Sequence, residues 1–283
     1  MSSPREMMNA CPFPRQRPDI TITPTDEPLF EVDFRELAWW FAVPEIGDRT
    51  LWALYMPPDW RLSSYLDMKA LRPGEVHGIE GVEVSTVDLE LSEAGELKET
   101  LWTLLGRLTE TRVEWLAVMS IQDNKRTLST LLEEDFDAAW GTSQRQVRHT
   151  GRFELLADGS YRQRSELLNP GEQIEATGVY CVTIGERSFS CLRVLDVTTT
   201  PTENSVMLEA FLTREGRTVL CRRYNGRLWA SKHGSAYPGP PWDERLPAHN
   251  RIVIDGVTFV HWYDCLSDRA CGIDPHSLPL PAE

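Results

Sequence analysis

The second half of the chain repeats one pattern four times: a β-rich run, a short turn and another β-rich run. The four candidate hairpins after Gly151 are FELL-ADGS-YRQRSE, GVYCVTI-GER-SFSCLRVLDV, SVMLEAFL-TREG-RTVLCRRY and RIVI-DG-VTFVHWY. Asp-Gly between two β-rich runs is a strong short-range signal for a hairpin. Successive hairpins are typical of antiparallel sheets. We therefore expect residues 150–268 to form an antiparallel β-rich domain, as a sheet or an open barrel.

The first half has a mixed pattern. LWALY and GIEGVEVSTVDLEL have the composition and alternation of strands. GELKETLWTLLGRL instead places leucines at helical spacing, at Leu97, Leu101, Leu104, Leu105 and Leu108. This stretch predicts an amphipathic helix. The chain as a whole is thus predicted to be an α+β protein, with a mixed N-terminal region followed by the antiparallel sheet.

Changes in composition suggest the boundaries of these regions. Residues 1–28 are rich in Pro, Thr and Ser and predict a flexible leader. The polar segment TSQRQVRHTG separates a mixed region, 29–145, from the β-rich domain, 150–268. Residues 269–283 read as a loose tail.

Composition and charge narrow the class of protein. Among 283 residues, 41% are hydrophobic and 25% charged, which is typical of a soluble globular chain. The formal charge of −14 opposes binding to nucleic acid and to anionic membranes, so we expect neither partner. The first residues contain no apolar run of signal-peptide length, and we expect a cytoplasmic protein. No nucleotide loop, GxSxG or HExxH motif occurs, so we assign no cofactor.

The segment VHWYDC, residues 260–265, has the highest density of reactive side chains. On a regular strand, His261, Tyr263 and Cys265 would share one face, while Trp262 and Asp264 would lie on the other. His261 and Cys265 would also be separated by roughly 13 Å of backbone, too far for a nucleophile and its base. These positions argue against a catalytic triad within the segment. A hydrolase using His261, Tyr263 and Asp264 is kept as an alternative hypothesis.

Cysteines and histidines in the second half do not predict a metal site or a fixed disulfide. A zinc set of His261, Cys265, Cys271 and His276 has the right donor atoms but poor spacing, and we assign no metal. Cys181 and Cys191 would face each other if the turn between their strands has three residues, and would be offset if it has two.

The segment GRTVLCRRYNGR concentrates positive charge in an acidic chain. Arg217, Arg222 and Arg223 could bind a carboxylate or phosphate, with Trp229 and Trp262 as candidate contact residues for the same ligand. The alternative is an ordinary cross-strand pair: a two-residue turn at Glu215-Gly216 would place Glu209 opposite Arg222, on an exposed face.

The segments GRTVLCRRYNG and IDGVTFVHWYDC resemble a family of bacterial proteins. In that family the C-terminal halves carry a "GRTVL, RRYN" hairpin and a closing "YVHWYDC" strand. The resemblance covers mainly residues 178–265. It implies a bacterial origin and an intact domain, and it implies no catalytic residue, ligand or cofactor.

Taken together, the sequence favours a non-catalytic module that binds a small molecule on a concave, aromatic-lined face of the β-rich domain. The hydrolase described above is one alternative. A second alternative is a regulatory or scaffold protein whose acidic surface binds another protein.

Overall fold

The computed structural model describes residues 8–30, 45–76, 78–91, 97–108, 113–122, 125–130, 153–155, 161–163, 172–198, 206–226, 251–254 and 257–278. These residues are almost entirely β-structure. The strands of the first half are β1 (Ile20–Pro24), β2 (Arg49–Met56), β3 (Arg61–Val76), β4 (Ile79–Leu91), β5 (Leu97–Leu108), β6 (Val113–Gln122) and β7 (Lys125–Thr130). Those of the second half are β8 (Phe153–Leu155), β9 (Tyr161–Gln163), β10 (Glu172–Ile184), β11 (Arg187–Thr198), β12 (Val206–Leu212), β13 (Thr218–Gly226), β14 (Arg251–Ile254) and β15 (Val257–Ser267). A short helix, α5 (Asp268–Cys271), and a 3-10 turn, η3 (Pro275–Ser277), follow.

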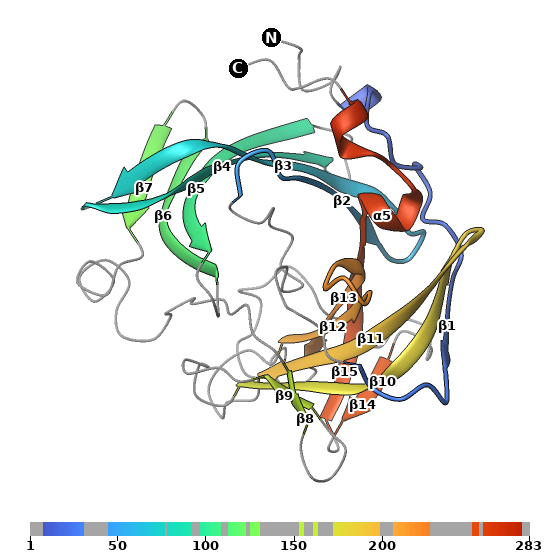
Figure 1. The fold of residues 1–283 in the computed structure, drawn as a ribbon. Coiled ribbons are helices and arrows are strands. Elements are labelled where there is room, and N and C mark those ends of the chain that lie inside the picture. Colours follow the sequence, from blue (N-terminus) through green and yellow to red (C-terminus); the bar gives the residue numbers. More distant parts are fainter. Residues whose placement is uncertain are drawn as a thin grey trace.

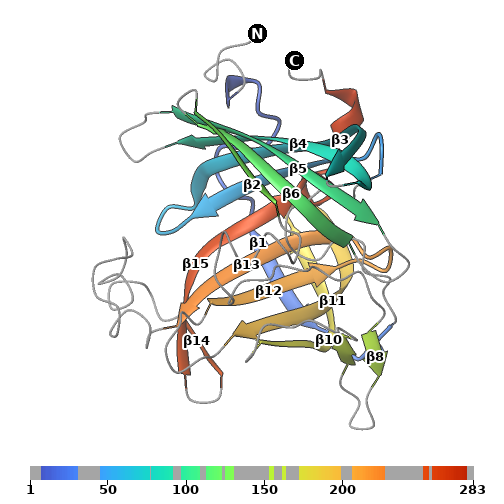
Figure 2. The same cartoon turned by 90° about the vertical axis from the view of Figure 1, so that its left-hand side faces the viewer.

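All fifteen strands belong to one sheet, whose neighbouring strands are antiparallel. Its main path runs β7-β6-β5-β4-β3-β2-β15-β13-β12-β11-β10-β9-β8, with β1 added to β10 and β14 to β15. The sheet curls so that its two halves lie opposite each other (Figure 1). Figure 2 shows β15 running between them. β15 is the last of the described strands, yet it pairs with β2 from the first half as well as with β13.

The predicted α+β class is wrong, because the first half is a run of antiparallel strands like the second. The stretch predicted as a helix is β5, paired with β4 on one side and β6 on the other. Its leucines serve two faces of the sheet. Leu104 packs with the cluster around Trp52, while Leu105 packs with Leu116 and Ala117 in a separate cluster. Because both faces of β5 contact apolar residues, leucines occur at odd and at even positions, and their spacing resembles that of an amphipathic helix.

The strand and hairpin predictions are confirmed. The stretches LWALY and GVEVSTVDLEL lie in β2 and β4, and Val82 and Val84 point to one apolar cluster as their alternation predicts. All four hairpins form, as the pairs β8-β9, β10-β11, β12-β13 and β14-β15. Ile184 pairs with Arg187, so the turn between β10 and β11 has two residues and Cys181 and Cys191 are offset.

The sheet has two apolar faces, which we name by their position in the curl. The concave face carries Trp52 and its cluster. Its buried members are Phe30, Trp52, Leu66, Met68, Ala70, Val84, Leu104, Ala176, Val179, Leu192, Val194, Leu208, Ala210, Leu212, Cys221, Tyr263 and Cys265. The outer face carries Leu51, Ala53, Tyr55, Phe211 and Leu266, among others. Alternation along β2 separates the two sets: Leu51 and Ala53 are outer, Trp52 is concave.

Both ends of the described chain cover the outer face. Met8 and Phe13 from the N-terminal segment pack there, and Ala270 from α5 joins the same cluster. Figure 1 shows both segments outside the curl of the sheet. Arg49, on β2, forms a two-point ion pair with Asp67, at 2.9 and 2.6 Å, and its Nη1 donates to the carbonyl oxygens of Pro275 and Leu278.

β1 lies within the predicted leader, and η3 lies within the predicted tail. β1 pairs with β10 from Ile20 to Pro24. The division of the chain into domains stays a prediction.

Candidate functional site

A β-bulge in β15 brings His261 and Asp264 together. Asp264 pairs with Arg222 and Tyr263 with Arg223, but the next partner on β13, Tyr224, pairs with His261. Trp262 is therefore an extra residue, and the alternation of side chains changes phase there. His261 and Asp264 both lie on the outer face, with His261 Nε2 2.6 Å from Asp264 Oδ1. The prediction that they point apart was wrong because it assumed a regular strand.

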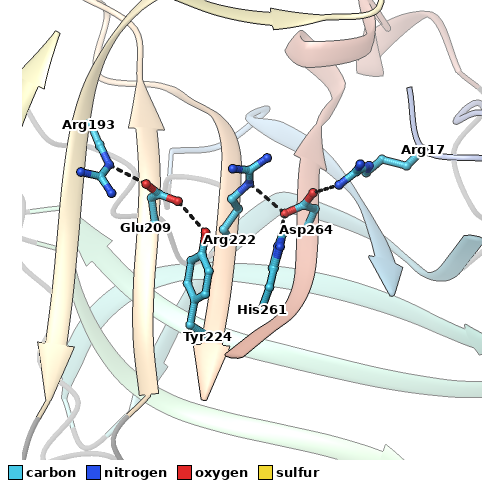
Figure 3. Close-up of polar contacts among 7 residues, drawn as sticks. All are labelled: Arg17, Arg193, Glu209, Arg222, Tyr224, His261 and Asp264. Carbon is cyan, nitrogen blue, oxygen red and sulfur yellow. Dashed lines mark hydrogen bonds and ion pairs between the residues drawn. The ribbon is translucent and has the colours of Figure 1, made fainter. Parts of the chain in front are cut away.

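Asp264 is the centre of a buried ion-pair cluster, shown in Figure 3. Its side chain is fully buried, and Oδ1 accepts from Arg222 Nε at 3.1 Å as well as from His261. Oδ2 accepts from Arg17 Nη1. Burial would raise the pKa of Asp264, but Arg222, His261 and Arg17 together hold it well below its usual range. An ionised carboxylate can only accept, so His261 Nε2 carries the hydrogen of their bond.

The N-terminal segment supplies Arg17 through a short stretch of strand-like pairing. Arg17 N donates to Trp60 O at 3.0 Å, and Leu62 N donates to Arg15 O at 3.0 Å. Gln16 and Arg61 form the bridge between these bonds. The Tyr55 hydroxyl holds the same segment through the Pro14 carbonyl, at 2.9 Å. The side chain of Arg17 is thereby directed at Asp264.

Aromatic rings enclose His261. Its ring centroid is 4.7 Å from Trp60 and 4.9 Å from Tyr224, the latter stacked at 27°. The guanidinium carbon of Arg17 lies 4.0 Å from the centroid of the Trp60 ring. Trp60 has a positive φ of 53°, which is costly for an aromatic residue. Its contacts with Arg17 and His261 offset that cost.

A second carboxylate extends the cluster across β12 to β11. Glu209 Oε1 accepts from Arg193 Nε at 2.5 Å, and Oε2 accepts from the Tyr224 hydroxyl at 2.9 Å. Arg193 also donates to Thr177 Oγ1 and lies over the Tyr180 ring. The expected register of Glu209 opposite Arg222 is confirmed. The expected exposure is wrong, because Glu209 is 4% exposed and its neighbours form a network.

We call Arg17, Arg193, Glu209, Arg222, Tyr224, His261 and Asp264 the outer-face cluster (Figure 3). Three guanidinium groups against two carboxylates leave one positive charge in excess. The side chains of Arg17 and Arg222 are each 18% exposed, and that of Arg193 is 17% exposed. Arg222 pairs with Asp264 through Nε, and its terminal nitrogens are directed away from that carboxylate (Figure 3). Such a cluster can receive an anion on arginines that the carboxylates behind them have already oriented.

Other predicted site residues lie elsewhere. Tyr263 is on the concave face, with Trp262 5.1 Å away between ring centroids and Arg223 6.0 Å from its ring. Arg217 forms an ion pair with Asp48 at 3.5 Å. Trp229 is outside the described residues. Of the predicted ligand contacts, the structure thus places Arg222 in the outer-face cluster.

Sequence reasoning missed Arg17 and Arg193. Arg17 lies 247 residues from Asp264 in the chain, in a segment without apolar periodicity, and no local signal could have joined them. Nor could Arg193 have been found from the predicted hairpins, because none of them joins β11 to β12, where Arg193 lies opposite Phe211.

The structure does not assemble the zinc set considered above. His261 lies on the outer face and Cys265 on the concave face. Within the described ranges, no three His, Cys, Asp or Glu side chains are grouped closely enough to hold a metal. Burial raises the pKa of Cys265 well above its usual value and that of Cys191 to about 12, which makes both thiols unreactive.

No protein-family model and no curated protein sequence matches this chain. A solved structure of a candidate exported protein from Bacteroides fragilis, with a YmcC-like fold, aligns with 82% of this chain and 98% of its own. The sequence identity is 10% and the TM-score is 0.28. A likeness at this level assigns neither fold nor function.

We withdraw the cytoplasmic location predicted above. That prediction depended on the lack of an apolar run among the first residues, and such a lack does not establish a location. In the parts of the chain that the structure describes, no helix has both the length and the apolar character needed to cross a bilayer.

Proposed function

We propose that the protein is a non-catalytic module that binds a small anionic molecule, a carboxylate or a phosphate, at the outer-face cluster. The observation that carries the proposal is the excess positive charge on three partly exposed arginines, held in place by Asp264 and Glu209. Guanidinium groups oriented in this way lose little entropy on binding and can donate two parallel hydrogen bonds to an anion.

The surroundings of His261 favour binding over catalysis. Its ring is packed between Trp60 and Tyr224, and its side chain is 7% exposed. Nε2 is engaged by Asp264, and Tyr263, the partner predicted for it, faces the other side of the sheet. A general base must reach the proton that it removes, and this arrangement directs His261 to a structural partner.

The test is titration of the protein with inorganic phosphate and with acetate at constant ionic strength, by calorimetry. Arg222→Met removes one guanidinium and keeps much of its volume. Loss of a charged hydrogen-bonding partner should weaken anion binding about tenfold or more. Arg214→Met is the matched control: it removes the same charge from an arginine that is 55% exposed and paired with Glu27, and it should bind as the parent protein does.

Arg193→Gln provides a second variant in case Arg222→Met does not fold, and each variant is first checked by thermal melting. If Arg222→Met and Arg193→Gln both bind the anions as tightly as the parent protein does, the proposal is contradicted. Absence of binding by either anion to the parent protein would contradict it as well.

A further inference from the structure

Two cysteines face each other across neighbouring strands. Cys221 on β13 and Cys265 on β15 are direct partners in the antiparallel ladder. Both belong to the apolar cluster of the concave face, so their side chains leave the sheet on the same side. The structure holds both as thiols, and their exposed fractions are 1% and 0%. Two thiols are thus buried together at one point of the ladder.

The spacing of such a pair suits a disulfide bond. Directly opposed residues of antiparallel strands have Cα atoms about 4.5 or 5.5 Å apart, according to their place in the hydrogen-bond pattern. Disulfides join residues whose Cα atoms are about 4.4–6.8 Å apart. Both kinds of opposed pair fall within that range. Cys221 and Cys265 can therefore be joined with little movement of either strand.

The cysteines of the β10-β11 hairpin lack this geometry. Cys181 is opposite Ser190, and Cys191 is opposite Tyr180. Consecutive residues of a strand point to opposite faces, so Cys181 and Cys191 lie on different sides of the sheet. In the ladders of the described strands, Cys221 and Cys265 are the one directly opposed pair of cysteines.

We propose that Cys221 and Cys265 form a disulfide bond when the chain folds in the presence of a small disulfide oxidant such as oxidised glutathione. The thiolate of one cysteine attacks the oxidant and releases one glutathione thiol. The second cysteine then attacks this mixed disulfide and releases the other. The two cysteines lose two electrons and two protons, and the oxidant takes them up as two thiols.

Burial determines when the bond forms and how long it lasts. In the folded protein, burial raises the pKa of Cys265 well above its usual value, and the thiolate that exchange requires is not populated. The exchange therefore takes place while the chain folds, before the concave face is covered. The same burial then keeps reductants away from the finished bond.

The bond would fix the strand register at the outer-face cluster. Arg222 and Asp264 form the next pair along the same ladder, on the opposite side of the sheet. A covalent link at one pair excludes a slip of register at the next. The proposal does not depend on anion binding, because it is argued from the ladder and from burial alone.

Peptide mapping tests the proposal on the full chain. The protein is refolded from urea in a mixture of reduced and oxidised glutathione, alkylated in urea without a reductant, and digested for mass spectrometry. We expect one linked pair of peptides, containing Cys221 and Cys265, and alkylation of the other four cysteines. Alkylation of Cys221 and Cys265, or a link from either to another cysteine, would overturn the proposal. Dithiothreitol should reduce the bond in urea and leave it intact in the folded protein; equal rates would contradict the protection by burial.

Thermal melting gives a second readout. A disulfide that closes a loop of about 45 residues should raise the melting temperature of the oxidised protein by about 8 °C over that of the reduced protein. Cys265→Ala should remove this difference. Cys191→Ala is the matched control, because it also removes a fully buried cysteine, and it should keep the difference. Equal melting temperatures of the oxidised and reduced parent protein would overturn the proposal, and this comparison needs no variant to fold.

Discussion

Replacement of Asp264 by Asn should destabilise the protein more than any other single carboxylate change among the described residues. Asn keeps the size of the side chain, but it removes the charge that Arg17 and Arg222 share, and its amide places a donor where both oxygens now accept. Breaking a buried ion pair by removing one partner costs about 3–5 kcal/mol. At roughly 2 °C per kcal/mol for a chain of this size, the melting temperature should fall by about 6–10 °C.

The assay is urea unfolding of the parent and of Asp264→Asn between pH 7 and pH 3. Because the folded-state pKa of Asp264 is below its usual range, its contribution is present above about pH 4 and is lost as the pH falls toward the folded-state pKa. The gap between the two proteins should therefore narrow below about pH 4. Asp59→Asn is the control, since Asp59 and Arg61 form an exposed pair that contributes little. A loss below about 1 kcal/mol, or a gap independent of pH, would refute the reasoning.

Two further predictions concern stability. Burial raises the pKa of Asp88 to about 6, so ionisation of this carboxyl opposes folding at neutral pH. Urea unfolding should show that Asp88→Asn stabilises the protein by about 1 kcal/mol at pH 7 and by nothing at pH 4. A loss of stability at pH 7 would contradict this prediction. Arg49→Met should release residues 275–278, because Arg49 donates to the carbonyl oxygens of Pro275 and Leu278. We expect faster hydrogen exchange and faster proteolysis in these residues. Unchanged protection would show that packing on the outer face holds this segment without Arg49.

Local patterns predicted strands well and one helix wrongly. The turn at Gly185-Glu186 is encoded within a few residues, and Asp-Gly stands in the sequence between the paired ends of β14 and β15, so the hairpins of the second half could be predicted from the sequence. The strand β5 could not be predicted in this way, because its leucines pack against neighbours on two faces, and those neighbours are known only from the complete sheet. Periodicity alone does not distinguish a helix from a strand that is apolar on both sides.

The candidate site was predictable only in part. The sequence singled out Arg222, His261 and Asp264, and the structure brings these three together. It could not indicate that they share a face, since one extra residue at Trp262 reverses the alternation on which the prediction depended. Nor could it indicate Arg17, whose place beside Asp264 is set by pairing between the N-terminal segment and the β2-β3 turn.

The bulge at Trp262 makes the outer-face cluster depend on the shape of β15 as much as on the identity of its residues. Deleting Trp262 would leave His261 two residues from Asp264, so a regular strand would keep both on the outer face and His261 opposite Tyr224 without a bulge. At the present spacing of three residues, the two share a face only because the strand bulges. A change elsewhere that straightened β15 at its present length would therefore turn His261 away from Asp264 without altering either residue.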